Sequence, residues 1–225
     1  MKVVVFGTTG MVGKGVLLEC LDDPRVTKVL TVGRSSAGVR HEKLEEVLHS
    51  DFEDYTAIED KLSGYDACFF CLGTTSVGKA EAEYRRITYD LTLAAARSMV
   101  AVNPAMVFCY VSGTGTDGTA SGRVMWARVK GETENALLEL GFKGAYMFRP
   151  GYIQPLRGVR SGTRWYQAVY DGIGLLYPAL RRLLPGAVTN TVTLGRALIR
   201  VAADGYPIRV LEGRDINASE AAPDR

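Results

Sequence analysis

The sequence predicts an α/β protein with a doubly wound, Rossmann-type parallel sheet. Three observations support this prediction. An apolar run at residues 3–6 passes through the glycine-rich stretch 7–13 into a helical pattern. Strand-like and helix-like segments then alternate along most of the chain. The 225 residues suffice for one such domain, and no repeat or low-complexity linker divides residues 1–225.

The glycine-rich stretch predicts a ligand. Its spacing is Gly-x-x-Gly-x-x-Gly: Gly7 permits a sharp turn, Gly10 a close backbone approach, and Gly13 close packing of helix on sheet. The helix that follows presents free N–H groups and a partial positive charge to a pyrophosphate. The alternative is a turn without a ligand. We expect a dinucleotide site that includes Gly7, Thr9, Gly10, Met11, Val12 and Gly13.

The other elements follow from hydrophobic pattern and turn residues. Further strands are expected at residues 28–32, 44–49, 67–72, 105–111, 144–148 and 207–211. Helices are expected at residues 11–21, 58–62, 80–101, 124–140 and 193–203. Residues 152–190 break the alternation and are expected to form a cap or substrate region, and residues 214–225 a frayed tail.

The second strand is followed by Arg34, where NAD-specific proteins carry an acidic residue for the ribose 2′-hydroxyl. A guanidinium binds a 2′-phosphate through charge and two parallel hydrogen bonds, so Arg34 predicts NADP(H) in preference to NAD(H). The alternative is a solvent-exposed turn arginine. After the third strand, Asp51 can bond the exocyclic amine of adenine and Phe52 can cover its ring. Their alternatives are a helix N-cap and a core aromatic.

Composition and cysteine usage count against a membrane-spanning, secreted, nucleic-acid-binding or metal-binding protein. No apolar run is long enough for a transmembrane helix, no signal peptide precedes the first strand, and no nucleic-acid motif is present. Four cysteines in apolar surroundings predict free thiols and a reducing, cytoplasmic location. Cys68 and Cys71 are three apart on a strand and so face opposite sides. No second ligand pair accompanies them, and we predict no metal site.

The net formal charge is −4 over residues 1–140 and +8 over residues 141–211. The basic part fits a solvated face, an anionic substrate, an acidic protein partner or a membrane surface. An apolar stripe at residues 165–177 lies among arginines. It predicts a cap packed on the sheet, with a dimer face or membrane-surface patch as the alternative. We therefore expect a monomer or a homodimer.

Several motifs stand in one order: the glycine turn, Gly33-Arg34, Cys71-Leu72-Gly73-Thr74-Thr75, Ser112, Val129-Lys130-Gly131-Glu132 and Phe148-Arg149-Pro150-Gly151. From residue 1 to about residue 211 they resemble the atypical short-chain dehydrogenase/reductase superfamily. More closely, the chain resembles the Tat-interacting oxidoreductase-like proteins, which bind NADPH and have epimerase/dehydratase and NmrA-like relatives. The resemblance implies that the cofactor site also includes Cys71, Leu72, Gly73 and Thr74.

The resemblance also implies a chemistry of Ser, Tyr and Lys, with Tyr-x-x-x-Lys on one helical face. Ser112 would then polarise the substrate oxygen, and Lys130 would hold the nicotinamide ribose. Trp126 stands at the tyrosine position, and an indole N–H does not release its proton at usable pH. The alternatives are a Ser112 bonded to backbone and a surface Lys130. The cofactor's carboxamide would lie along the turn Pro150, Gly151, Tyr152 and Ile153.

Three functions are compatible with these patterns. The first is an NADPH-dependent oxidoreductase on a small organic substrate, with an unconventional proton donor or water. The second is a non-catalytic NADP(H)-sensing regulator that binds a protein partner through residues 152–190. The third is a scaffold that has lost its ligand. The intact glycine turn and Arg34 count against the third, and Trp126 counts against the ordinary form of the first.

Overall fold

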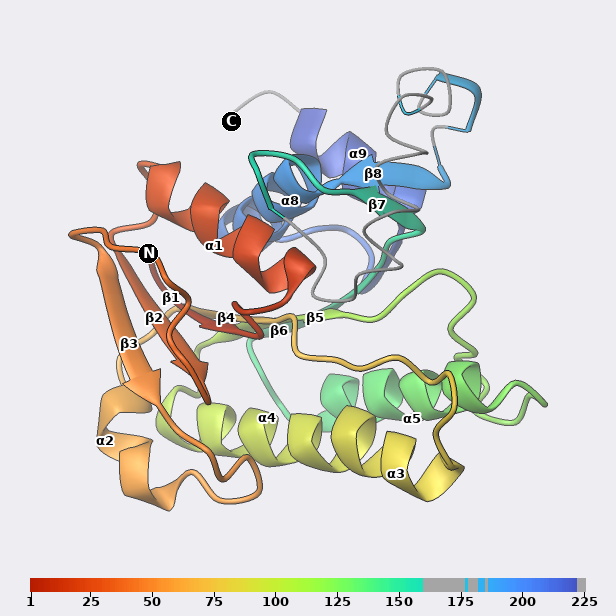
Figure 1. Ribbon diagram of the computed structural model, residues 1–225, viewed down its shortest axis with the longest axis horizontal. Helices are drawn as coiled ribbons and strands as arrows, with labels where there is room; N and C mark the ends of the chain where they lie inside the picture. Colours follow the sequence, from red (N-terminus) through yellow and green to blue (C-terminus); the bar gives the residue numbers. More distant parts are fainter. Residues whose placement is uncertain (160–176, 178–181, 185, 222–225) are drawn as a thin grey trace.

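A seven-stranded parallel sheet forms the centre of the computed structural model, which describes residues 1–159, 177, 182–184 and 186–221 (Figure 1). Its strand order is β3-β2-β1-β4-β5-β6-β9. The order reverses between β1 and β4, which is the place where doubly wound sheets bind ligands. The predicted α/β fold is confirmed. The strands are β1 (Lys2–Phe6), β2 (Lys28–Gly33), β3 (Leu44–Leu48), β4 (Ala67–Phe70), β5 (Val107–Val111), β6 (Gly144–Arg149) and β9 (Val210–Glu212).

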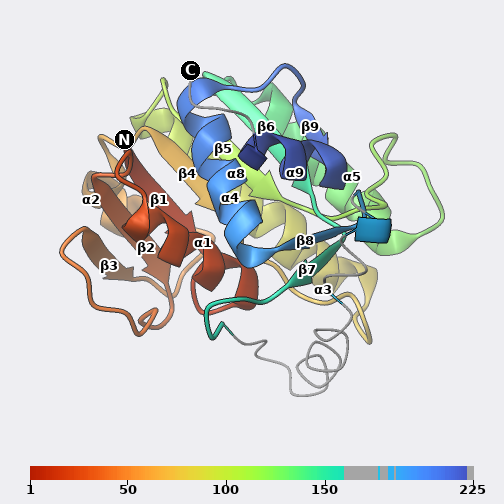
Figure 2. The same cartoon turned by 90° about the horizontal axis from the view of Figure 1, so that it is seen from above.

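Helices cover both faces of the sheet, and Figure 2 shows the three helices of one face from above. That face carries α1 (Met11–Asp22), α8 (Thr191–Asp204) and α9 (Gly213–Ala221). Successive strand residues point to opposite faces, so Val3 and Val5 pack under α1 and α8, and Val4 and Phe6 pack on the other side. The opposite face carries η1 (Thr56–Ile58), α2 (Glu59–Leu62), α3 (Glu81–Arg85), η2 (Arg86–Asp90), α4 (Leu91–Val102) and α5 (Met125–Glu139).

Two expectations about the elements are corrected. The helix expected at residues 80–101 is interrupted by a π-helical turn, η2, between α3 and α4. The frayed tail expected from residue 214 is instead helix α9 as far as residue 221. Ile216 is fully buried in the core under α8, and the Asp215 carboxylate accepts the Glu212 N–H at the start of the helix. These two contacts order a segment whose polar composition suggested disorder.

Of the expected cap at residues 152–190, the structure describes residues 152–159, 177, 182–184 and 186–190. Strands β7 (Tyr152–Gln154) and β8 (Val188–Asn190) pair in parallel as a separate two-stranded sheet, which the sequence did not indicate. The apolar stripe lies outside the described residues except for Tyr177, whose hydroxyl accepts from Asn190 at 2.7 Å. In the described part of the chain, no helix is both long and apolar enough to cross a membrane.

Candidate functional site

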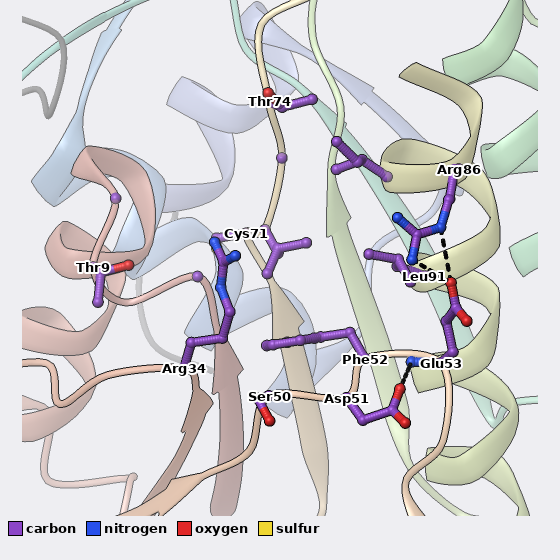
Figure 3. Close-up of a pocket in the computed structure, with 15 residues that line it drawn as sticks. Thr9, Arg34, Ser50, Asp51, Phe52, Glu53, Cys71, Thr74, Arg86 and Leu91 are labelled. Carbon is purple, nitrogen blue, oxygen red and sulfur yellow. Dashed lines mark hydrogen bonds and ion pairs between the residues drawn. The ribbon is translucent and has the colours of Figure 1, made fainter. Parts of the chain in front are cut away.

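A cavity of about 480 Å³ lies at the carboxyl ends of β1, β2 and β4 (Figure 3). Ten of the residues expected to bind the cofactor line it, and they come from separate loops of the chain. These are Gly7, Thr9, Gly10, Arg34, Asp51, Phe52, Cys71, Leu72, Gly73 and Thr74. Five further residues line the cavity that the sequence did not predict as cofactor-binding: Ser50, Glu53, Arg86, Ile87 and Leu91.

The three glycines of the turn have different surroundings. Gly7 has φ +81°, and a Cβ there would lie 2.7 Å from the backbone of Cys71. A Cβ on Gly13 would lie 2.2 Å from the Gly7 carbonyl oxygen. Gly10 is different, because its Cβ would meet only the Gly7 oxygen, at 3.3 Å. Gly7 and Gly13 are therefore required by the turn itself, whereas Gly10 leaves its space to the cavity.

The N-terminus of α1 fits an anion. Gly10 is its N-cap residue, and no side chain caps it. The Lys14 N–H donates to the Gly10 carbonyl at 2.9 Å, so the N–H groups of Met11, Val12 and Gly13 precede the first helical bond. Unpaired N–H groups at the positive end of a helix are a common phosphate site. Met11 and Val12 contribute only backbone, since neither side chain lines the cavity.

Two arginines line the cavity, and their surroundings differ. Arg86 pairs with Glu53, with its Nε and Nη2 atoms 2.8 and 2.6 Å from the carboxylate. Arg34 is exposed, and within the described chain it has no hydrogen bond or ion pair. Figure 3 shows the Arg34 side chain pointing toward Cys71 beside the glycine turn. The cavity therefore has one uncommitted guanidinium in its described lining.

The opposite part of the cavity is mostly apolar. Phe52 is 7% exposed and packs against Tyr55 with ring centroids 6.2 Å apart, so it is also a core aromatic. Asp51 accepts the Glu53 N–H at 3.0 Å and so caps a turn. The core-aromatic alternative therefore describes Phe52, whereas Asp51 caps a turn and not a helix, since the N-cap residue of η1 is Tyr55. Both residues line the cavity. Ile87 and Leu91 complete this wall, and their i, i+4 spacing was the only signal in the sequence.

Ser112 and Lys130 lie together outside this cavity. The Lys130 ammonium donates to the Ser112 carbonyl at 2.6 Å. The Ser112 hydroxyl donates to the Glu134 carboxylate at 2.5 Å, with the Phe148 carbonyl at 3.2 Å. The backbone alternative for Ser112 is therefore only partly right, because its shorter bond goes to a side chain. Glu134 was not anticipated; its signal was a position four residues after Lys130 on one helical face.

The charges around Ser112 are buried or half-buried. Glu134 is 1% exposed and is held by the Arg149 guanidinium, whose Nη2 lies 2.5 Å from one carboxylate oxygen. The Glu134 carboxylate raises the pKa of Arg149. Burial lowers the pKa of Lys130 to about 8, although the nearby Glu134 carboxylate opposes that shift. Lys130 is therefore a half-buried amine with a lowered pKa and not a fully exposed surface lysine.

The turn after β6 lies close to Ser112 and Lys130. A Cβ on Gly113 would be 3.9 Å from both the Lys130 Nζ and the Pro150 carbonyl oxygen. Gly151 has no room for a side chain, since a Cβ would lie 2.3 Å from the Ala187 oxygen. The next two residues, Tyr152 and Ile153, begin β7, and neither they nor Pro150 and Gly151 line the described cavity. The predicted site residues thus fall into two neighbouring groups.

Comparison with known proteins identifies the family. No family model matches the chain. It is 30% identical to the protein HTATIP2 of Rattus norvegicus over 173 residues, which cover 76% of this chain and 70% of that protein. It is also 30% identical to the protein fmp52-1, mitochondrial, of Aspergillus terreus, over 72% of this chain and 68% of that protein. The chain belongs to the atypical short-chain dehydrogenase/reductase family.

Solved structures show the same fold for this short-chain dehydrogenase/reductase. ElxO with NADP bound matches with a TM-score of 0.68 at 15% identity, covering 97% of this chain and 98% of that one. A short chain dehydrogenase family protein from Francisella tularensis matches with a TM-score of 0.65 at 12% identity, covering 91% of each chain. The Bordetella bronchiseptica enzyme WbmF in complex with NAD⁺ matches with a TM-score of 0.65 at 17% identity, over 96% and 76%.

The helix that carries Lys130 in this short-chain dehydrogenase/reductase also carries Trp126, four residues earlier. The indole is partly buried and lies against the loop after β5, since a Cβ on Gly115 would be 3.3 Å from its ring. Burial raises the pKa of the Cys71 thiol in the other group to about 12, which disfavours the thiolate near neutral pH. Lys130, with a pKa of about 8, can therefore exchange a proton near neutral pH.

Proposed function

We propose that the protein binds NADP(H), in preference to NAD(H), and is an oxidoreductase on a small organic substrate. The observation that carries this proposal is the uncommitted Arg34 guanidinium in a cavity built on the glycine turn. A 2′-phosphate is the group that distinguishes the two cofactors, and a free guanidinium is a strong partner for it. The bound NADP and NAD⁺ of ElxO and WbmF are consistent with a nicotinamide dinucleotide in this fold.

Each part of the cofactor has a fitting partner in the chain. The pyrophosphate would lie at the free N–H groups of Met11, Val12 and Gly13, close to Gly10. The adenine would lie against the apolar wall of Phe52, Ile87 and Leu91. The nicotinamide end would pass Lys130 and the turn that contains Pro150, Gly151, Tyr152 and Ile153.

The bound cofactor would supply or accept hydride at its nicotinamide ring. The chain's own residues then bind the ribose, exclude water and hold a proton. As an ammonium, Lys130 would bind the ribose hydroxyls. Its pKa of about 8 would also let it hold a proton, because this value is near the one that suits general acid catalysis at neutral pH. Trp126 carries no proton that it can release, so the tyrosine expected in this family has no direct replacement on α5.

The test is a calorimetric titration of the protein with NADPH and, separately, with NADH, which measures the affinity for each dinucleotide. We expect tighter binding of NADPH. The Arg34→Ala variant should lose about 10- to 150-fold in NADPH affinity, the value of one charge-assisted hydrogen-bonded pair, with little change for NADH. Arg40→Ala is the matched control, because Arg40 is an exposed arginine of the same loop that does not line the cavity. Equal affinity of the parent protein for both dinucleotides would contradict the proposal.

A second candidate function is an NADP(H)-sensing regulator without catalysis, binding a protein partner through residues 152–190. Trp126 favours it, since the family's proton donor is replaced by a group that cannot act as one. Tight NADPH binding without turnover of any carbonyl compound would favour this function over the first. The FMP52 relatives have "mitochondrial" in their names, and a cytoplasmic location remains a prediction for this chain, as does a monomer or homodimer.

A further inference from the structure

Arg34 belongs to a loop that is fixed to the rest of the protein on both sides of it. The loop follows β2, and the Gly33 carbonyl at its start accepts from the His49 N–H at 2.9 Å. Ala37, three residues after Arg34, is 9% exposed and packs in the core cluster that also holds Leu17 of α1. The backbone around Arg34 is therefore held at two points, whereas its guanidinium is uncommitted in the described chain.

Glu46 of β3 forms the second of these attachments. One of its carboxylate oxygens accepts the Ala37 N–H at 2.7 Å, and the other accepts the Ser36 hydroxyl, also at 2.7 Å. The Ser36 oxygen accepts in turn from the Gly38 N–H at 3.0 Å. Hydrogen bonds to a carboxylate are roughly twice as strong as neutral ones. Glu46 therefore holds three successive residues of the loop, two directly and one through Ser36.

The sheet determines which carboxylate reaches the loop. Glu46 lies opposite Thr31 in the parallel register of β2 and β3, on the face that α1 covers. Successive strand residues point to opposite faces, so the neighbouring Glu45 points to the other side. There it pairs with Lys28 at 2.6 Å on the exposed surface. Of these two adjacent glutamates, Glu46 is the one that contacts the Arg34 loop.

The helix that follows the glycine turn holds the same loop. The Lys14 ammonium of α1 donates to the Ala37 carbonyl. Ala37 thus has its N–H bound from β3 and its carbonyl bound from α1, whose N-cap residue is Gly10. These contacts fix the Arg34 loop relative to the N-terminus of α1. A 2′-phosphate and a pyrophosphate belong to one ligand, so this relative position determines whether Arg34 can reach the first when the helix binds the second.

We propose that Glu46 is a positioning residue for cofactor specificity, because it holds the loop in the conformation that presents the Arg34 guanidinium to the cavity. It binds the loop and not the guanidinium, so the charge of Arg34 stays available to a phosphate. A guanidinium on a loose loop would have to be ordered on binding, which costs part of the affinity that its phosphate bonds contribute. The inference rests on the proposed function, in which Arg34 binds the 2′-phosphate.

The test compares NADPH with NADH by calorimetry, because a role limited to folding would lower both affinities together. In Glu46→Ala we expect the preference for NADPH to fall roughly two- to tenfold, the cost of ordering one long side chain, with little change for NADH. Glu46→Gln keeps one acceptor oxygen for the Ala37 N–H and should lie between the parent and Glu46→Ala. Glu45→Ala is the matched control and should keep the parent preference. An unchanged preference in Glu46→Ala, or an equal loss of both affinities, would overturn the proposal.

A double-mutant cycle shows whether Glu46 acts through Arg34. In an Arg34→Ala background, Glu46→Ala should not change the ratio of the two affinities further, since the positioned group is absent. Additive losses would mean that Glu46 affects the phosphate by another route. A stronger NADPH preference in Glu46→Gln than in the parent would mean that the carboxylate repels the phosphate. Either result would contradict a positioning role.

The loop is also observed without any ligand, by NMR relaxation. Glu46→Ala should lower the order parameters of the backbone amides of residues 35–38 and of the Arg34 Nε, and Glu45→Ala should not. Order parameters that stay at the parent values in Glu46→Ala would refute the positioning role directly.

The failures of the two proposals are distinguishable. Equal affinity of the parent protein for NADPH and NADH overturns the proposed function, and with it the specificity role of Glu46. If the parent prefers NADPH and Arg34→Ala loses that preference while Glu46→Ala keeps it, the proposed function stands and the inference about Glu46 is wrong.

Discussion

A Cβ atom on Gly131 would lie 1.7 Å from the carbonyl oxygen of Asp117, a separation that two such atoms cannot adopt. Gly131 follows Lys130 on α5, and Asp117 belongs to the loop after β5. The loop is tied to the same helix by the Asp117 N–H, which donates to the Ala127 carbonyl at 3.0 Å. The missing side chain therefore lets the helix and the loop approach closely, which sets Lys130 against Ser112.

Gly131→Ala should destabilise the protein even though alanine favours a helix. Alanine gains about 1 kcal/mol over glycine in a helix interior. Forcing the loop away from α5 should more than offset this gain, with a net loss of about 1–3 kcal/mol in the free energy of unfolding. Urea unfolding measures the change. Gly73→Ala is the control, since a Cβ there meets nothing within 4 Å, and equal effects of both changes would refute the steric explanation.

The half-buried Lys130 should make the free energy of unfolding depend on pH. Its pKa is about 8 in the folded protein, against an ordinary value of 10.5, so the unfolded chain holds the proton more tightly. Protonation therefore opposes folding below pH 8, and this penalty declines as the pH rises from 8 toward 10.5. The free energy of unfolding of the parent, relative to Lys130→Met, should rise across that window by at most about 1.4 kcal/mol per pH unit.

Urea unfolding of both proteins between pH 7 and 10 measures this difference. The comparison with Lys130→Met removes the contribution of tyrosines and other groups that titrate in the same range. A difference that stays constant with pH would show that Lys130 keeps its ordinary pKa in the folded protein.

The fold could be predicted from the sequence because its signals are local. The glycine spacing, the apolar strands and the alternation of elements each act within a few residues, and together they specify a doubly wound sheet. The tail was mispredicted because Ile216 is a single apolar residue in a polar segment, and only its contact with the core makes it structural. The π-helical turn η2 also has no local signal, although Ile87 in it lines the cavity.

In the candidate site, too, some residues have a local signal in the sequence and others depend on tertiary contacts. Arg34 and the glycine turn could be predicted because position along the chain fixes them at the ends of strands. Glu134 could not, because a glutamate on a helix is ordinarily solvated, and only the packing of Arg149 from β6 against α5 accounts for its burial. The orientation of the Ser112 hydroxyl depends on that packing and was equally beyond the sequence.

Gly10→Val should abolish dinucleotide binding and leave the fold intact. Gly10 has φ −85° and ψ 163°, a conformation that valine adopts readily. Its Cβ would meet only the Gly7 carbonyl oxygen, at 3.3 Å, so the branched side chain would extend into the space of the pyrophosphate. Calorimetry with NADPH and circular dichroism test the two halves of this prediction.

Gly7→Val is the contrasting variant, because a side chain there would meet the Cys71 backbone at 2.7 Å in a positive-φ conformation. It should lose the fold together with the binding. Normal NADPH affinity in a folded Gly10→Val protein would mean that the cofactor binds elsewhere.

The last prediction concerns the residue that replaces the family's tyrosine. Trp126→Tyr places a phenol one helical turn from Lys130, whose ammonium favours the ionised form of a nearby hydroxyl. We expect this variant to gain measurable NADPH-dependent reduction of aldehydes and ketones over the parent protein. General acid catalysis contributes about 10²–10⁴-fold, which sets the upper limit of the gain.

Trp126→Phe is the matched control, since it opens the same space without a hydroxyl. Loss of NADPH absorbance over a panel of carbonyl compounds measures the rates, and equal rates in the tyrosine and phenylalanine variants would show that the phenol has no catalytic role here. Vigorous turnover by the parent, unchanged in Lys130→Ala and Ser112→Ala, would place the chemistry on other residues altogether.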